Sequence, residues 1–279
     1  MIENQPPTSE EPETPDLAGT ISPAPATAEM TLPRIGPEHG RPTPEAPVLL
    51  AIDTCTRRSS VALRDAFTLR AECSWESDRH HTAAVSAQIH RMMHACGIGP
   101  AQIGAVAVAI GPGSFTGVRC GLAIAKGMAV ARDLPLIGVT TFEVLAAAQP
   151  DHKVPVYTVV EAGRQRVAAC RYEWQGEKLW TAAPWSIQTW QAFADAIRTP
   201  ASGQGSESGS QAGTLVWVCG DLSPELAALL NGRVQIAPAP FNLRRAGVLA
   251  ELGYLQWQKG ETDDPYTLMP LYPPELKGT

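Results

Sequence analysis

The chain shows two kinds of apolar pattern in its first half. Short apolar runs at residues 48–53, 60–64 and 68–74 are separated only by brief polar turns, which predicts three strands in an antiparallel meander. Residues 81–96 instead repeat their apolar side chains every three or four positions, as an amphipathic helix does. Residues 105–110 form a further apolar run, which we predict to be a buried strand.

The same order continues to residue 150. An Ala- and Gly-rich run at 120–131 predicts a tightly packed helix, 135–139 a strand, and 142–148 a helix that Thr140 and Thr141 can cap. Three strands, helix, strand, helix, strand, helix is the element order of a ribonuclease-H-like lobe. We therefore predict an α/β fold with a first lobe over residues 48–150.

The remaining residues, 151–279, read as a second lobe. Strands are predicted at 156–160, 166–172 and 179–182, and a helix at 186–198 with Trp190, Phe193 and Ile197 on one side. Further strands are predicted at 215–219 and 234–236, and helices at 224–230 and 243–258.

Two segments lack the apolar content of a packed core. Residues 1–47 are rich in Pro, Glu and Thr, and we predict a disordered acidic tail. Residues 200–213 are rich in Ser and Gly, and we predict a flexible surface insertion within the second lobe.

Charge and cysteine content narrow the functional classes. Of 28 acidic and 22 basic side chains, eight and two lie in residues 1–47, which leaves 20 of each for the folded part. That balance predicts no surface that grips nucleic acid unaided. The six cysteines show no metal-binding spacing, and neither a membrane span nor a secretory signal is apparent, so we expect a cytoplasmic protein.

One junction combines more chemistry than its neighbours. Three glycines and a proline separate the predicted strand at 105–110 from the helix at 120–131, and exposed amides at a helix start favour an anion. The turn either cradles a phosphate or docks a partner, or else its glycines only permit close helix–strand packing. Its candidate residues are Gly111, Pro112, Gly113, Ser114, Phe115, Thr116, Gly117 and Arg119.

A second candidate follows the first predicted strand. In actin-like ATPases and sugar kinases, an Asp at this place opens a phosphate-binding hairpin and helps to hold the metal. Here Asp53 is followed by Thr54 and Thr56. The alternative is a turn in which the Asp53 carboxylate accepts local backbone amides.

Two histidines in the predicted helix at 81–96 have the spacing of metal ligands. His90 and His94 are four residues apart, but no third ligand accompanies them. We therefore interpret them as partly exposed surface residues and predict no metal site.

The stretch AVAVAIGPGSFTGVRCGLAIAKGMA, continued by LPLIGVTTFEVLA, closely resembles the bacterial TsaB (YeaZ) family of tRNA threonylcarbamoyladenosine biosynthesis proteins. The phrase GPGSFTGVR is close to diagnostic for that family. The resemblance covers residues 48–147 well and is weaker beyond them.

The resemblance implies an actin-like architecture of two ribonuclease-H-like lobes with mixed sheets. It also implies a non-catalytic subunit that pairs through its first lobe with the catalytic subunit TsaD, which transfers threonylcarbamoyl to adenosine 37 of tRNAs that read ANN codons. An ATPase, TsaE, joins the assembly, and tRNA is reached only through the complex. ATP or ADP with Mg²⁺ is a candidate ligand at the interface of the complex, and the lone protein is expected to be a homodimer.

Two departures matter to this comparison. TsaD-like relatives carry a His-x-x-x-His metal pair, and alignment through Glu143 places Thr141 and Leu145 at those positions, which supports the absence of catalysis. Many relatives begin the second lobe with Asp-Ala-Arg, whereas this chain has Glu161-Ala162-Gly163-Arg164, so Glu161 and Arg164 are its second-lobe candidates.

The competing hypothesis is a stand-alone actin-like ATPase or phosphotransferase. In that case Asp53, Thr54, Thr56 and the loop from Gly111 to Gly117 would hold phosphates with Mg²⁺. Against it, Glu161 is the one second-lobe candidate for the acidic residue that such a site needs.

Overall fold

The computed structural model describes six stretches of the chain. The predicted tail at 1–47 and the insertion at 200–213 lie outside these stretches, apart from residues 29–30 and 47, so both stay predictions. Among the described residues, no helix combines the length and the apolar character that crossing a membrane requires. The stretches are 29–30, 47–76, 81–150, 153–175, 178–197 and 215–271.

The first sheet has five strands in the order β4-β3-β2-β5-β6. The first three strands along the chain pair antiparallel, which confirms the predicted meander, whereas β5 and β6 add in parallel on the other side of β2. The strands are β2 (Val48–Asp53), β3 (Arg58–Arg64), β4 (Leu69–Glu76), β5 (Ile103–Ala109) and β6 (Leu136–Val139).

The second sheet repeats this plan. Its order is β9-β8-β7-β10-β11, again with three antiparallel strands and two parallel additions, and the two-residue strand β1 (Glu29–Met30) pairs beyond β9. The repeated strand order confirms two ribonuclease-H-like units by topology alone. The strands are β7 (Val156–Glu161), β8 (Arg166–Gln175), β9 (Lys178–Thr189), β10 (Trp217–Gly220) and β11 (Gln235–Ile236).

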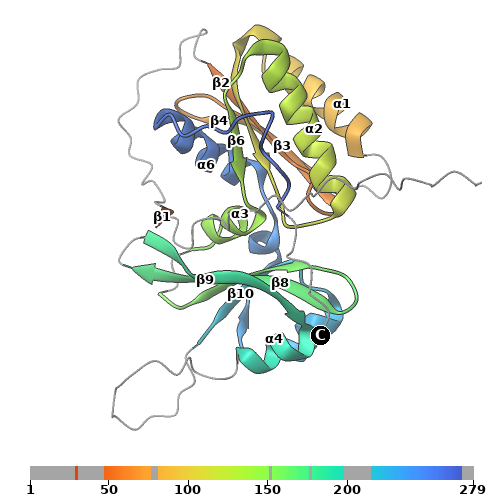
Figure 1. Cartoon of the computed structure of the whole chain (residues 1–279), viewed down its shortest axis with the longest axis vertical. Helices are drawn as coiled ribbons and strands as arrows, with labels where there is room; N and C mark the ends of the chain where they lie inside the picture. The colour runs from red at the N-terminus through yellow and green to blue at the C-terminus, as the bar shows by residue number, and fades with distance from the viewer. Residues whose placement is uncertain are drawn as a thin grey trace, which may run out of the picture.

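Helices alternate with the two sheets in layers (Figure 1). α1 (His81–Ala95) and α2 (Phe115–Arg132) cover the outer face of the first sheet. α3 (Thr141–Ala147) and α6 (Ala246–Gln258) lie between the sheets, where one continuous apolar cluster joins both halves. α4 (Trp190–Ala196) and α5 (Pro224–Leu230) cover the far face of the second sheet.

Helix α6 comes from the end of the chain but packs on the first sheet. Its first two amides, on Ala246 and Gly247, donate to Ser60 Oγ of β3 (2.8 Å) and Glu72 Oε1 of β4 (3.0 Å). Strands of the first sheet thus supply the cap that the helix itself lacks. The two parts of the chain on either side of residue 150 therefore pack against each other. The domain limits stay a prediction.

The segment after α6 crosses the edge strand of the first sheet. Asp263 donates its amide to Leu136 O (2.8 Å) and accepts from Gly138 N through Oδ2 (2.7 Å). Farther on, Leu271 N donates to Ile110 O (2.7 Å) beside the Gly-rich turn. This segment covers a strand edge that would otherwise be open to pairing.

Two predicted boundaries are corrected. Residues 186–189, predicted to start a helix, are strand, because they pair with Arg166–Ala169 of β8, and Thr189 then caps α4 through its hydroxyl. The last helix begins at Ala246 rather than at residue 243, because Leu243 and Arg245 have extended backbones.

Candidate functional site

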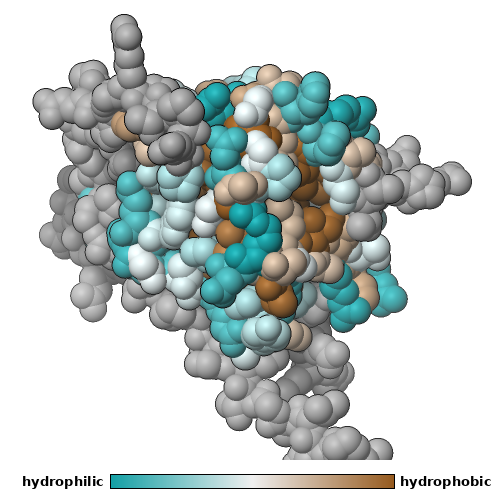
Figure 2. Space-filling model, turned by 90° about the horizontal axis from the view of Figure 1, so that it is seen from above, coloured by the Kyte–Doolittle hydropathy of each residue, from teal (hydrophilic) through white to brown (hydrophobic). Residues whose placement is uncertain are grey.

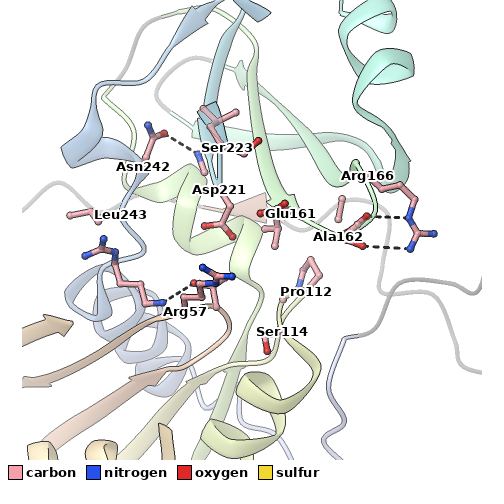
Figure 3. Close-up of a pocket in the computed structure, with 18 of the residues that line it drawn as sticks. Arg57, Pro112, Ser114, Glu161, Ala162, Arg166, Asp221, Ser223, Asn242 and Leu243 are labelled. Carbon is pink, nitrogen blue, oxygen red and sulfur yellow. Dashed lines mark hydrogen bonds between the residues drawn. The ribbon is translucent and has the colours of Figure 1, made fainter. Parts of the chain in front are cut away.

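A pocket of about 1070 Å³ lies between the two sheets, at the ends of the central strands (Figure 3). The first half contributes the loop after β2 and the Gly-rich turn. The second half contributes the β7–β8 turn and the segments after β10 and around Asn242. Crevices at the carboxyl ends of strands are where open α/β sheets bind ligands.

The glycines of the Gly-rich turn are used for close packing. A Cβ on Gly113 or Gly117 would overlap the carbonyl oxygens of Cys55 or Thr54, and Ser114 N donates to Cys55 O (2.5 Å). Gly111 has a φ of 101°, which favours glycine. These contacts favour the packing interpretation of the glycines over a phosphate cradle.

The start of α2 is closed by its own cap. Ser114 Oγ accepts from Gly117 N (3.3 Å), which is the bond of a helix N-cap. The next side chains point outward instead: Phe115 is 57% exposed, Thr116 is exposed, and the Arg119 guanidinium lies 3.7 Å from the centre of the Phe115 ring. Pro112 and Ser114 remain on the pocket wall (Figure 3).

Asp53 at the end of β2, and Thr54 and Thr56 in the loop after it, all make bonds within the chain. Asp53 is 1% exposed and accepts from Cys55 N through Oδ1 (2.8 Å), the local turn that was one of the two interpretations. Thr54 Oγ1 donates to Gly117 O (2.6 Å). Thr56 Oγ1 accepts from Arg58 N (3.3 Å).

Of the two candidate residues in the second half, Glu161 and Arg164, the first alone lines the pocket. Glu161 ends β7 and lines the pocket, whereas Arg164 lies in the β7–β8 turn with a φ of 53° and is exposed. The arginine that lines the pocket there is Arg166, whose guanidinium donates to Gly163 O and Ala162 O, both at 3.5 Å (Figure 3).

Sequence reasoning missed Arg244, a buried residue whose partners Asp221 and Thr56 line the pocket. This side chain is 3% exposed, and its Nε lies 3.2 Å from Asp53 Oδ2 while its Nη1 lies 2.9 Å from Asp221 Oδ1. Its Nη2 donates to Thr56 Oγ1. Burial acts to lower the pKa of Arg244, but the carboxylates of Asp221 and Asp53 outweigh it and raise that pKa, so the guanidinium stays charged.

These residues do not fit a Mg²⁺–nucleotide site. Both carboxylate oxygens of Asp53 and the hydroxyl of Thr56 are engaged by the chain itself, and the Arg244 guanidinium lies between the carboxylates of Asp53 and Asp221. Thr141 and Leu145 are buried in α3, and the described residues contain no group of three His, Cys, Asp or Glu side chains that could hold a metal.

Comparisons with known proteins match the chain to TsaD and to TsaB proteins. Residues 75–212 match the family model of TsaD, tRNA N6-adenosine threonylcarbamoyltransferase. The TsaB proteins of Escherichia coli and Bacillus subtilis are 35% and 30% identical to the chain over 138 and 136 residues, 47% and 49% of this chain. Each alignment spans 59% of the relative's own length.

Solved structures support the fold. A crystal structure from Pseudomonas aeruginosa, of an uncharacterized protein with similarity to peptidase YEAZ, superposes with a TM-score of 0.65 at 22% identity and covers 81% of this chain and 99% of that chain. YeaZ from the same organism gives 0.64 at 21% identity, with the same coverage. These comparisons support the TsaB (YeaZ) family for this chain, and its two repeated sheets agree with an actin-like fold.

Proposed function

We propose that this chain takes part in the biosynthesis of threonylcarbamoyladenosine in tRNA as a non-catalytic subunit. Its partner is a TsaD-like catalytic subunit, which modifies adenosine 37 of tRNAs that read ANN codons. The observation that carries the proposal is a contrast at the Gly-rich turn: its polar groups bind within the chain, whereas the adjoining face of α2 leaves apolar groups to solvent.

The polar residues of the turn support a role without catalysis. A catalytic group must be free to contact a substrate, but Asp53, Thr54 and Thr56 each satisfy another part of this chain. The matching TsaD model concerns a transferase, so the proposal is that this chain keeps the fold of such a transferase and not its chemistry.

The outer face of α2 supports a docking role. Phe115 and Val130 are 57% and 48% exposed near its two ends, and a Cβ on Gly127 would meet nothing within 4 Å. Aromatic side chains are enriched at protein interfaces, and a glycine lets another backbone approach closely. Apolar surface lies between hydrophilic margins on the end of the molecule that carries the first sheet (Figure 2).

The paralogous relationship suggests the geometry of the complex. TsaD-like transferases match this chain over α1 and α2, so both partners would present the same pair of helices. Two such faces can pair about a pseudo-twofold axis, and two copies of this chain can pair about a true one when the partner is absent. The homodimer is therefore part of the same proposal.

Charge supports contact with tRNA through the complex. The 20 acidic and 20 basic side chains of residues 48–279 balance, so this part of the chain offers no bulk positive field for a polyanion. The TsaD-like partner would then supply the tRNA contacts in the cytoplasm, with a TsaE-like ATPase as a third component.

The test is light scattering after size-exclusion chromatography, with this protein mixed with the TsaD homologue of the same organism. We expect a 1:1 complex that Val130→Arg abolishes. The matched control is Leu215→Arg, because Leu215 is also 48% exposed but lies in the second half, and it should leave the complex intact. Mass spectrometry of tRNA from cells depleted of TsaB should show the modification restored by the wild type and not by Val130→Arg.

Two outcomes would contradict the proposal. One is the absence of any complex with the TsaD homologue, with or without ATP and the TsaE homologue. The other is a complex that Leu215→Arg disrupts and Val130→Arg does not, which would move the docking face to the second half.

A further inference from the structure

Arg244, two positions before α6, is a residue for which the sequence predicted no role in the site. Its guanidinium is buried between the two sheets and reaches groups from both of them. Asp53 ends the central strand β2 of the first sheet, and Asp221 directly follows β10 of the second sheet. Thr56 adds a hydroxyl from the loop after β2.

The two carboxylates converge between the two sheets, where both contact Arg244. Carboxylate, hydroxyl and carbonyl oxygens are the ligands that Mg²⁺ and Mn²⁺ take. Here the same oxygens accept hydrogen bonds from one planar guanidinium, whose fork of donors can serve both carboxylates at once. The positive charge already occupies the place where the carboxylates would direct a metal ion.

Because the Arg244 guanidinium is buried, a divalent ion cannot easily displace it. Asp53 and Arg244 are 1% and 3% exposed, so neither ion can regain water without a local rearrangement. Removing one partner of a buried ion pair leaves an uncompensated charge, which is far costlier than losing a surface pair. A divalent ion from solution would have to expel a charged group that three hydrogen bonds hold between Asp53, Asp221 and Thr56.

We infer that Arg244 is a built-in cation that takes the place of a divalent metal between Asp53 and Asp221. The cleft consequently takes no Mg²⁺ or Mn²⁺, and the two sheets are held together without a ligand. A small neutral residue at position 244 should convert the same carboxylates into a weak divalent-metal site.

Mn²⁺ alone is the probe, with the unbound ion measured by electron paramagnetic resonance in the presence of the full chain. We expect no binding by the wild type at millimolar Mn²⁺. Arg244→Ala should bind one Mn²⁺ with a dissociation constant on the order of 10⁻⁴–10⁻³ M, the range of weak carboxylate sites. Adding Asp53→Asn to Arg244→Ala should abolish that binding.

Arg244→Lys is the matched control, because it keeps a positive charge and loses the planar fork. It should bind no Mn²⁺. Wild-type binding that Asp53→Asn abolishes would overturn the inference, and so would a folded Arg244→Ala chain that binds none.

A second measurement covers the case in which Arg244→Ala folds poorly. Without Arg244 the buried carboxylate of Asp53 is uncompensated, so the midpoint of thermal unfolding should fall by roughly 10 °C. Mn²⁺ should raise the midpoint of Arg244→Ala and leave that of the wild type unchanged, and a failure of Mn²⁺ to do so would also overturn the inference. These readouts use the chain alone, so they are independent of whether it binds a TsaD homologue.

Discussion

At the scale of single residues, Gln149 joins the two halves, because both the nitrogen and the oxygen of its side-chain amide form hydrogen bonds. It is 4% exposed, and its amide nitrogen donates to Leu145 O and to Phe241 O, both at 2.8 Å. Its carbonyl oxygen accepts from the indole nitrogen of Trp217 (2.9 Å). Three groups from α3, β10 and the segment before α6 thus depend on one amide.

Gln149→Ala should lower the free energy of unfolding by about 2–3 kcal/mol, because it leaves buried donors and acceptors without partners. Urea denaturation measures the change. Trp217→Phe supplies the control, because it removes the indole donor. Gln149→Ala should cost about 1 kcal/mol less in that background, and equal costs in both would show that the indole bond does not stabilise the fold.

The buried cysteine thiols make the free energy of unfolding depend on pH in the alkaline range. Burial raises the pKa of Cys170 from 9.0 to about 11, so in the folded chain this thiol keeps its proton where the unfolded chain has lost it. The folded state then binds more protons between these values. Its free energy of unfolding is therefore unaffected below about pH 9 and falls as the pH rises toward 11.

Cys170→Ala should flatten this pH dependence. Each fully protected thiol contributes a slope of about 1.4 kcal/mol per pH unit, and the variant removes one of them. Urea denaturation at pH 8, 9 and 10 under reducing conditions measures the slope. The slope above pH 9 should be smaller than in the wild type but not zero, because burial also raises the pKa of Cys55 and Cys219. An unchanged slope would contradict the assignment.

Some residues of the candidate site can be found from the sequence and others cannot. Asp53, Pro112 and Ser114 lie next to strand ends, where local pattern points to turns and helix caps. Arg244 is separated from Asp53 by 191 residues, and nothing in its neighbourhood marks it as more than a surface arginine before a helix. Only the folding of α6 back onto the first sheet brings the two together.

At the scale of elements, two glycines of α2 lie on different faces of the helix: Gly121 faces the loop after β2, and Gly127 faces open space. A Cβ on Gly121 would overlap the Thr54 hydroxyl, whereas a Cβ on Gly127 would point into open space. The sequence shows both as members of one Ala- and Gly-rich run, and periodicity alone does not tell which face meets the sheet. Packing of the loop after β2 decides it.

Substituting alanine at these two positions should change stability in opposite directions. Gly127→Ala should raise the free energy of unfolding by about 0.5–1 kcal/mol, because alanine loses less backbone entropy in a helix. Gly121→Ala should lower it by about 1–3 kcal/mol, because the added methyl group crowds Thr54. Urea denaturation at low protein concentration measures both, and a shift of the same sign would refute the assignment of faces.

In residues 186–189 of β9, pairing with β8 determines the structure, and the local helical spacing does not. Residues 186–189 precede Trp190, Phe193 and Ile197, and their helical spacing made the whole stretch resemble one helix. The pairing of Ile187 and Gln188 with β8 instead extends the strand to Thr189. Such pairing depends on a segment about 20 residues away, which a local window does not include.

At the scale of the whole molecule, the order of elements along the chain was predictable and the exchange between halves was not. Apolar runs predicted the strands of both halves and the first antiparallel meander, whereas the mixed sheets were implied by the family resemblance. Yet α6 completes the first sheet from the end of the chain, and its residue Gly253 lies so close to Ala107 of β5 that a Cβ would overlap it. The two halves consequently share one apolar cluster.

This sharing predicts that residues 47–150 do not fold alone. Without α6, the inner face of the first sheet exposes apolar residues that include Leu49, Ala51 and Ala107, all buried in the full chain. The isolated fragment should therefore lack a cooperative thermal transition, whereas the full chain should unfold in one transition by both near- and far-ultraviolet circular dichroism.

A linked fragment isolates the contribution of α6. Residues 47–150 joined through a Gly/Ser linker to residues 244–271 restore the helix, its caps from Ser60 and Glu72, and the segment that covers β6. This chain should regain a cooperative transition, because both faces of the first sheet are again covered. If residues 47–150 alone fold as cooperatively as the linked chain, α6 does not complete the first half, and the boundary at residue 150 marks an independent domain.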